Sequence, residues 1–361
     1  MNDTTGASAS TDTAVLIGRF QPYHLGHAQL IDAALALAPH VVVVLGSSFQ
    51  ARNAKNPFTW SERAAMIGAT LDREARERVR FVAVRDYYDD SLWADAVRSA
   101  VEETQAAPGN GAARIALVGH AKDASSYYLN HFPDWQAVTV QATRKLDATS
   151  VRRVLFEADD LAVSLSVLQD TLPQAVRHYL KAWAMLPHFA PLAEEHKKIA
   201  SYKAAWKSAP YAPIFVTADA LLVSAEHVLL IRRGGFPGKG LWAIPGGFVE
   251  PRERLLQGAM RELVEETRVA VLASTLEGCL VEVKVFDHPE RSQRGRTITH
   301  AHHFDLRSDA LPTIEASDDA AQACWLPIAG LAAMEDQFFE DHFHILDHFL
   351  GLSTAPAAPG D

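Results

Sequence analysis

Two histidines three residues apart, His24 and His27, are the first side chains in this sequence that could act together in chemistry. They lie in the segment GRFQPYHLGH at 18–27, between an apolar run typical of a strand and a helical pattern. Their spacing places both imidazoles on one face of the first helical turn, where backbone N–H groups and the helix dipole favour phosphate. Gly26 allows a phosphate chain to approach the backbone, and Arg19 adds positive charge. The segment predicts a phosphate site that stabilises negative charge without a covalent intermediate.

Three glutamates in the second half could hold a metal ion. Glu262, Glu265 and Glu266 stand at i, i+3 and i+4, which places their carboxylates on one face of a helix. Like charges this close repel one another unless a cation joins them. Carboxylate oxygens without His or Cys suit Mg²⁺, with Mn²⁺ as the alternative.

An acidic helix face by itself is usually a solvated surface. Here the glycine-rich loop GGFVEPRE at 246–253 precedes the helix, and Arg261 can pair with Glu253 to hold the loop against it. The sequence therefore favours a metal site over a solvated face.

The elements that must position these side chains differ between the two halves of the chain. In the first half short apolar runs alternate with helical patterns, and the β-branched run at 41–46 is typical of a parallel strand buried on both faces. This order predicts an α/β domain with a doubly wound parallel sheet. Strands are expected at 14–18, 41–46, 79–84, 114–118 and 138–141, and helices through residue 38, at 61–71, at 91–103 and from 146.

The second half carries longer strands. A helical stretch at 172–206, interrupted at Pro187 and Pro191, ends before the segment SAPYAP at 208–213, where we place the domain boundary. Beyond it, strands are expected at 214–224, 227–232, 276–286 and 297–306, with helices at 255–267 and 335–350. The predicted organisation is a disordered tail at 1–13, a domain at 14–185, a helical linker at 186–210, a domain at 211–352 and a disordered tail at 353–361.

Composition excludes several classes of protein. Lys and Arg number 34 against 44 Asp and Glu, which gives 34 − 44 = −10, so we expect no general basic surface for nucleic acid. The two cysteines, Cys279 and Cys324, argue against a disulfide framework or a cysteine zinc site. Neither a secretory signal nor an apolar run of ~20 residues is present, which predicts a soluble cytoplasmic protein without a membrane partner.

The first half resembles a known enzyme family. The histidine segment is similar to the HxGH signature of the nucleotidyltransferase superfamily, which leaves the substrate open. The segments NPFTWSER at 56–63, DDSLW at 89–93, GHAKD at 119–123 and LDATSVR at 146–152 narrow the resemblance to archaeal-type nicotinamide mononucleotide (NMN) adenylyltransferases, over about residues 14–180. The family usually has Ser where this chain has Asp147.

This resemblance implies transfer of AMP from ATP to NMN, giving NAD and pyrophosphate, with Mg²⁺. It assigns catalysis to His24, His27 and Arg152. It assigns ATP and NMN contacts to Gly18, Arg19, Phe20, Gly26, Arg63, Trp93, Lys122, Asp123, Thr149 and Ser150.

Alternatives remain for individual residues and for the reaction. Trp93 would stack on the nicotinamide ring, or it is a core tryptophan. Lys122 and Asp123 are also typical of a solvated loop. Another HxGH enzyme, acting on pantetheine phosphate or transferring a cytidylyl group, would carry the same signature, although the context of Trp93 favours NMN.

The second half resembles the Nudix hydrolases. From Gly247 the chain follows their box, Gx₅Ex₇REUxEExGU with U aliphatic, except that Arg268 replaces the last Gly. The resemblance implies an α+β Nudix fold with a mixed sheet and hydrolysis of a nucleoside diphosphate linked to another moiety. Glu262, Glu265 and Glu266 would then be both catalytic residues and metal ligands.

Substrate choice in this half must come from outside the Nudix box. Gly246, Gly247, Arg291, Arg294 and Arg296 are the candidate substrate contacts, although a solvated hairpin loop is an equal interpretation of the three arginines. Asp318 and Asp319 could position the attacking water, but a surface loop is the favoured interpretation.

The combination of the two halves resembles bifunctional proteins of NAD metabolism whose Nudix half cleaves ADP-ribose to AMP and ribose 5-phosphate. The expected partners are therefore ATP, NMN or NAD, and ADP-ribose, and a homo-oligomer is left open. The alternative from another functional class is a non-catalytic Nudix half that senses a metabolite and regulates the first half.

Overall fold

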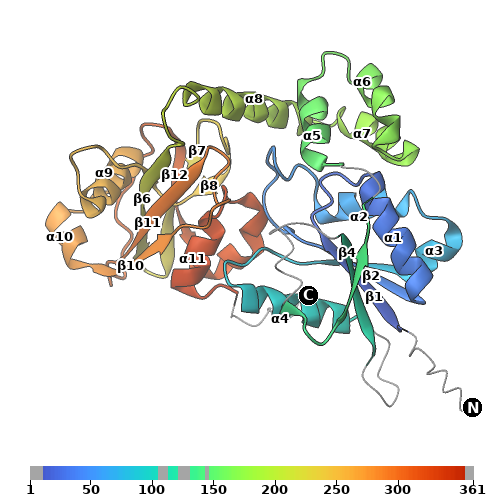
Figure 1. Cartoon of the computed structure of the whole chain (residues 1–361). Helices are drawn as coiled ribbons and strands as arrows, with labels where there is room; N and C mark the ends of the chain where they lie inside the picture. The colour runs from blue at the N-terminus through green and yellow to red at the C-terminus, as the bar shows by residue number, and fades with distance from the viewer. Residues whose placement is uncertain (1–10, 105–112, 121–130, 143–145, 354–361) are drawn as a thin grey trace, which may run out of the picture. The chain divides into compact units, whose positions relative to one another are not determined.

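Two structural units, Met1–Ala193 and Glu194–Asp361, divide the chain. The computed structural model describes residues 11–104, 113–120, 131–142 and 146–353 (Figure 1). The division falls inside the segment predicted as a helical linker. Most of the two predicted tails lies outside the described residues. Thr11 is buried and Asp12 pairs with Arg114, so residues before the predicted boundary at 14 belong to the folded unit.

A five-stranded parallel sheet forms the centre of the first unit, as predicted. Its strands are β1 (Thr13–Gly18), β2 (His40–Leu45), β3 (Val79–Ala83), β4 (Ile115–His120) and β5 (Gln136–Val140), in the order β3-β2-β1-β4-β5. The order reverses between β1 and β4, and in open sheets of this kind ligands bind at that point, beyond the carboxyl ends of the strands. Gly18 and His120 end these two strands, which locates the predicted phosphate segment at the switch point.

Helices cover both faces of this sheet because its central strands are apolar on both sides. Val42 and Val44 pack against Ala94 and Val97 of α4 (Asp90–Glu102), so Val43 faces the opposite side. The remaining helices are α1 (Leu25–Leu37), α2 (Trp60–Gly68), α3 (Arg73–Arg78), α5 (Ala148–Glu157), α6 (Leu161–Val167) and α7 (Gln174–Trp183), with a 3₁₀ turn η2 (Leu168–Asp170).

The second unit is built on a mixed sheet, again as predicted. Its strands are β6 (Ile214–Ser224), β7 (His227–Arg233), β8 (Trp242–Ala243), β9 (Gly246–Phe248), β10 (Leu280–Phe286), β11 (Arg296–Asp305) and β12 (Ala320–Pro327). The main order is β10-β11-β6-β7-β12, in which β11 and β6 run parallel and the other pairs are antiparallel.

Two layers of helix cover this sheet. Ala220 of β6 packs with Leu263 of α9 (Leu255–Thr267), whereas the next residue, Leu221, packs with Leu346 of α11 (His342–Leu350) on the other face. This alternation is the expected period of two. A short helix α10 (Ala273–Gly278) and a 3₁₀ segment η3 (Ile328–Gln337) complete the unit, and α8 (Phe189–Ala205) contains the division between the units.

Three expected elements differ from the structure. The strand expected from 276 begins at Leu280, because α10 occupies the residues before it. The last helix, expected at 335–350, is divided into η3 and α11, with Glu340 between them at φ 43. Pro191 does not interrupt α8, since it lies in the first turn, where proline removes no helical hydrogen bond.

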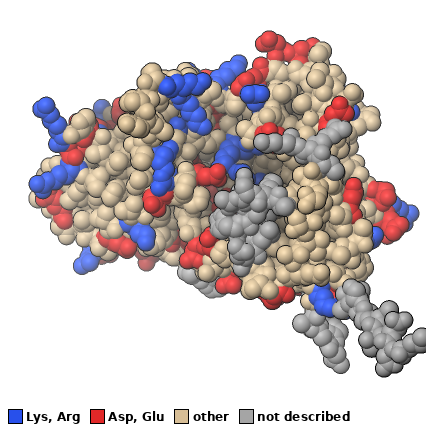
Figure 2. Space-filling view, viewed as in Figure 1, with Lys and Arg blue, Asp and Glu red and all other residues tan. Residues whose placement is uncertain are grey.

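Charges on the visible face are interspersed, with Lys and Arg next to Asp and Glu (Figure 2). In the described part of the chain no helix is long and apolar enough to span a membrane.

Arg268 ends α9 in the left-handed conformation, at φ 42 and ψ 35. Glycine is the usual residue at such a helix end. The departure from the Nudix box has therefore kept the backbone geometry, and Arg268 also pairs with Glu315 at 3.0 Å through two exposed side chains.

We expect Arg268→Gly to stabilise the protein by about 1 kcal/mol, because glycine avoids the left-handed cost of a side chain and the exposed ion pair contributes less than that. Denaturant unfolding measures the change. Glu315→Gln removes the ion pair alone and should change the free energy of unfolding by only a few tenths of a kcal/mol. Destabilisation by Arg268→Gly would mean that the ion pair outweighs the backbone strain.

Candidate active sites

His24 and His27 form a stacked pair at the start of α1. Their ring centroids lie 3.7 Å apart with 13° between the ring planes. Each Nδ1 accepts a backbone hydrogen bond from the other residue, at 3.3 and 3.4 Å, so the two side chains close the N-terminus of the helix. Because both Nδ1 atoms accept, the proton of each neutral ring is on Nε2. The pair can therefore present N–H donors to a negatively charged ligand.

Small residues and a strained phenylalanine make this stacking possible. A Cβ on Gly26 would lie 3.1 Å from Cε1 of His24, and one on Gly18 would lie 3.0 Å from the ring of Phe20. Phe20 is buried in the left-handed region at φ 49, and its ring packs edge-on against His27 with 4.7 Å between centroids. Gly18, Phe20 and Gly26, predicted as ligand contacts, thus also support the two histidine rings.

Two arginines add positive charge near this turn. Arg152 of α5 donates to the carbonyl oxygen of Gln21 at 2.6 Å and to Oγ1 of Thr149 at 3.1 Å. Burial, together with the charge of Arg19, lowers the pKa of Arg152 to about 10. The positive charges of Arg19 and Arg152 repel each other, and a bound anion such as a phosphate would offset that repulsion.

Asp147, which replaces the usual Ser, caps α5. Its carboxylate accepts from the backbone N–H of Ser150 at 2.8 Å and from the Ser150 hydroxyl at 2.9 Å. Ser150, predicted as an ATP contact, is therefore hydrogen-bonded to the cap, whereas the Thr149 hydroxyl lies on Arg152.

Arg63, predicted as an ATP or NMN contact, is bonded to the backbone of two loops. Its side chain is fully buried, and its guanidinium donates to the carbonyl oxygens of Arg19 and Gly46, both at 2.6 Å, and to Oγ of Ser48 at 3.0 Å. A guanidinium held in this way ties together the loops after β1 and β2. These contacts hold the loop containing Arg19, and the role of Arg63 as an ATP or NMN contact stays a prediction.

Trp93 lies in the first turn of α4, half-buried against a core cluster. Its ring meets Phe132 edge-on with 5.8 Å between centroids. This placement leaves one part of the ring in the core and another accessible, so the stacking role stays a prediction. Lys122 and Asp123 lie outside the described residues.

In the second unit, Arg261 joins the glycine-rich loop to the metal helix. It binds both carboxylate oxygens of Glu253, at 3.0 and 2.7 Å, as predicted from the sequence. The same guanidinium contacts Glu262 at 2.9 Å and Glu265 at 2.8 Å. A Cβ on Gly247 would lie 2.4 Å from Oε1 of Glu262, so a side chain there would displace that carboxylate from its position.

Glu266 is the most buried carboxylate of the helix face. It accepts from the backbone N–H of Gly246 at 2.9 Å, and burial together with the neighbouring Asp319 raises its pKa to about 10. Burial also raises the pKa of Glu262. The carboxylates of Glu262, Glu266 and Asp319 therefore repel one another when charged.

This chemistry fits a hard divalent cation, since the donors are carboxylate oxygens whose charged forms require compensation. As they stand, no three His, Cys, Asp or Glu side chains of the described ranges are arranged around a common metal position. Instead the guanidinium of Arg261 is the cation that bridges Glu262 and Glu265.

Asp319 was favoured as a surface-loop residue, and it is an exposed loop residue that also lies next to Glu266 of α9. The backbone N–H of Ser317 donates to the carbonyl oxygen of Glu266 at 3.0 Å, which holds this loop against the end of α9. Gly234 donates to the carbonyl oxygen of Asp319 at 2.8 Å, and a Cβ on Gly234 would meet that oxygen at 2.6 Å. Only the close approach of two loops distant in sequence brings Asp319 to the site.

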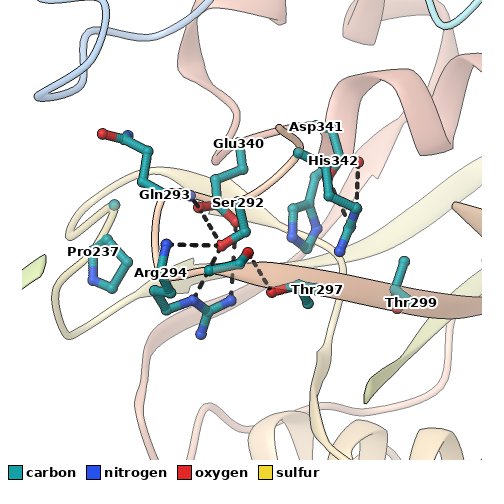
Figure 3. A network of polar contacts seen from close by, with 12 residues as sticks. Pro237, Ser292, Gln293, Arg294, Thr297, Thr299, Glu340, Asp341 and His342 are labelled. Carbon is teal, nitrogen blue, oxygen red and sulfur yellow. Dashed lines mark hydrogen bonds and ion pairs between the residues drawn. The ribbon is translucent and has the colours of Figure 1, made fainter. Parts of the chain in front are cut away.

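The three arginines predicted as substrate contacts have separate partners. Arg291 is buried in a two-bond ion pair with Asp341, at 2.7 and 2.8 Å, and Arg296 binds Asp287. Arg294 lies near Ser292 and Glu340 (Figure 3), and its guanidinium is 5.2 Å from the ring centroid of Phe248, which follows Gly247. Of the three arginines, Arg294 is the one that contacts the glycine-rich loop, through Phe248.

Comparisons with known families agree with this division. The NUDIX domain model matches residues 213–349, and the Cytidylyltransferase-like model matches residues 15–97. Over 187 residues, 52% of this chain, the sequence is 33% identical to the nicotinamide/nicotinic acid mononucleotide adenylyltransferase of Acinetobacter baylyi and covers 94% of that protein. It is 34% identical over 108 residues to the ADP-ribose pyrophosphatase of Methanocaldococcus jannaschii, covering 30% of this chain and 59% of that protein.

A solved structure is similar over nearly the whole chain. The bifunctional NMN adenylyltransferase/ADP ribose pyrophosphatase from Francisella tularensis has a TM-score of 0.85 and 34% identity, covering 94% of this chain and 99% of that one. A second structure of a bifunctional NMN adenylyltransferase/ADP ribose pyrophosphatase from Francisella tularensis, complexed with AMP and a Mn ion, has a TM-score of 0.84 and 33% identity. It covers the same shares of the two chains.

The raised pKa of Glu266 predicts a pH dependence of stability in metal-free protein. The pKa is about 10 in the folded state against an ordinary value of 4.5, so the folded state holds the proton more tightly. The stabilising contribution is therefore complete below pH ~4.5 and is lost as the pH rises toward 10. Thermal melts in EDTA should show the Tm of the second unit falling across this range.

Glu266→Gln should flatten that slope, because glutamine keeps the shape without titrating. Glu265→Gln, half-exposed on the same helix face, is the matched control and should keep the slope. A slope that persists unchanged in Glu266→Gln would assign the pH dependence to other groups.

Proposed function

The chain belongs to the family of bifunctional NMN adenylyltransferase/ADP-ribose pyrophosphatases, and from this premise we propose that it makes NAD at one site and hydrolyses ADP-ribose at the other. The first reaction joins ATP and NMN to give NAD and pyrophosphate. The second gives AMP and ribose 5-phosphate. The observation that carries the proposal is the presence in one chain of the stacked His24–His27 pair and of the carboxylate cluster around Arg261.

In the first unit we assign catalysis to charge stabilisation and positioning. An oxygen of the NMN phosphate attacks the α-phosphorus of ATP, and the bond from that phosphorus to the leaving pyrophosphate breaks. His24 and His27 donate from Nε2 to phosphate oxygens, and Arg152 and Arg19 offset the negative charge that develops. Mg²⁺, when bound, supplies further neutralisation of the triphosphate. No covalent intermediate on the protein is required.

In the second unit Glu262, Glu265 and Glu266 would hold the divalent cation, for which we propose Mg²⁺. When bound, the cation would supply charge neutralisation on the pyrophosphate and would lower the pKa of a water molecule. Arg261 holds Glu253 by two hydrogen bonds, so the glycine-rich loop stays anchored while Glu262 and Glu265 act as ligands. Asp319, beside Glu266, is the carboxylate that we assign to accept the proton of the attacking water.

We retain Arg294 as a substrate contact in this unit. Arg291 and Arg296 are held by Asp341 and Asp287, and Arg294 lies 3.9 Å from Glu340, so each of the three charges has a partner within the protein. Arg294 packs over Phe248, where a guanidinium can reach a phosphate and an aromatic ring is close to the glycine-rich loop.

Crossed variants test whether two independent sites exist. His27→Ala should lower NAD synthesis by ~10²–10³ and leave ADP-ribose hydrolysis near wild type, because it removes one charge-stabilising donor. Glu266→Gln should do the reverse, and added Mg²⁺ should recover part of its hydrolysis. Product analysis with ATP and NMN, and separately with ADP-ribose, measures both activities.

Each variant is the control for the other, since both are the same full-length chain. Equal loss of both activities in a folded variant would contradict two separate sites. Wild-type hydrolysis in Glu266→Gln would favour a second unit that binds a metabolite without cleaving it.

Trp93→Ala tests the proposed nicotinamide contact. Loss of a stacked, partly desolvated cationic ring corresponds to up to ~30-fold in the KM for NMN, with little change in the KM for ATP. Leu92→Ala is the matched control, because Leu92 is the exposed neighbour on the same helix turn. An unchanged KM for NMN together with a lower Tm would make Trp93 a core residue only.

A further inference from the structure

Strand β10 forms an open edge of the sheet in the second unit. In the described part of the chain it pairs with β11 and with no other strand, so its other side presents unpaired backbone groups (Figure 1). An exposed strand edge is a template for pairing with another strand. Natural proteins usually protect such edges or use them in an interface.

The residues of this edge alternate between valine and charge. Val281, Val283 and Val285 are 50%, 45% and 44% exposed, although valine is among the residues most often buried. Glu282 and Lys284 stand between them and are also exposed. The sequence Val-Glu-Val-Lys-Val is thus apolar at every second position. It carries a negative charge directly before its central valine and a positive charge directly after it.

This pattern is complementary to itself. In an antiparallel pair related by a two-fold axis at Val283, residue 282 of one chain lies opposite residue 284 of the other. Glu282 then faces Lys284 twice, Val281 faces Val285 twice, and Val283 faces its own copy. Two-fold axes at Glu282 or at Lys284 would place like charges opposite each other, and axes at Val281 or Val285 would not place Glu282 opposite Lys284. Opposite-charge pairing therefore favours the register centred on Val283.

We propose that β10 is a homodimer interface in which two copies of the chain pair through residues 281–285 and join their sheets across a two-fold axis. The pairing of β10 with β11 is regular from Glu282 to Phe286, and the only shift in its register lies between Leu280 and Glu282. The centre of the interface is therefore regular strand. The irregularity lies at its end, where it limits the pairing to a short segment.

The size of the contact sets its strength. Stable interfaces bury about 1,200–2,000 Å² in total, and five residues of strand from each chain fall below that. We therefore expect a dimer that dissociates on dilution, with a Kd in the micromolar range or weaker, on the order of 10⁻⁶–10⁻⁴ M. Its charge pairs are exposed, so salt should weaken it further.

Charge reversal tests the register directly in the full-length protein. Glu282→Lys places two lysine pairs opposite each other, Lys284→Glu places two glutamate pairs, and each should raise the dimer Kd by at least about tenfold. The double variant Glu282→Lys/Lys284→Glu restores both opposite pairs and should dimerise like the wild type. Sedimentation velocity over a range of protein concentrations measures all four chains.

The double variant is also the folding control, because it contains both substitutions. Glu282 lies 3.4 Å from His348, a contact that Glu282→Lys loses and Lys284→Glu leaves intact. A wild-type chain that stays monomeric at millimolar concentration overturns the proposal. Single variants that dimerise as well as the wild type, or a double variant that stays monomeric, overturn it too.

A cysteine at the proposed axis gives an independent measurement. Directly opposite residues in an antiparallel pair have Cα atoms about 4.5–5.5 Å apart, within the range that a disulfide spans. Val283→Cys should therefore form a covalent dimer under diamide. Val285→Cys should not, because its partner is Val281, and the wild type with Cys279 and Cys324 is the background control. Equal cross-linking of the two variants would exclude this register.

Discussion

Like charges held close together in partly buried positions are the constraint on which both sites depend. In the first unit the charge of Arg19 adds to the effect of burial on the pKa of Arg152. In the second unit Asp319 and burial raise the pKa of Glu266. Each cluster is costly without a partner of the opposite charge, so the first site is prepared for an anion and the second for a cation. The clustered positive charges of the first unit therefore suit a phosphate ligand, and the clustered carboxylates of the second unit suit a metal ion.

The rest of each unit keeps these groups from moving apart. Arg63 binds the carbonyl oxygens at the ends of β1 and β2 and so holds the loop that carries Arg19. Arg261 does the corresponding work in the second unit, where it binds Glu253 in the loop and Glu262 on the helix. In both units an arginine that is hydrogen-bonded within the protein fixes the geometry in which the like charges meet. Removal of either one would release backbone as well as charge.

Local patterns predicted much of this arrangement. The parallel order of the first sheet follows from its continuous apolar strands, and the face shared by Glu262, Glu265 and Glu266 follows from helical spacing. The sequence could not show which charged side chains form ion pairs with residues far away along the chain. Arg291 and Arg294 stand three residues apart, yet one is buried against Asp341, fifty residues away, and the other packs over Phe248. Asp319 lies at the metal helix only because Gly234 allows its loop to approach.

The two substitutions in otherwise regular motifs follow the same physical logic. Arg268 accepts the left-handed conformation that glycine would adopt without cost, and Asp147 caps α5 through the hydrogen bonds that a serine side chain could also accept. In both positions the backbone role has been kept while the side chain has gained a charge. Asp147 lowers the positive field around Arg152, and Arg268 places a cation at the carboxyl end of α9, where the helix dipole favours it. Motif positions that serve the backbone can therefore change residue type, whereas a side chain at Gly247 would displace the carboxylate of Glu262 itself.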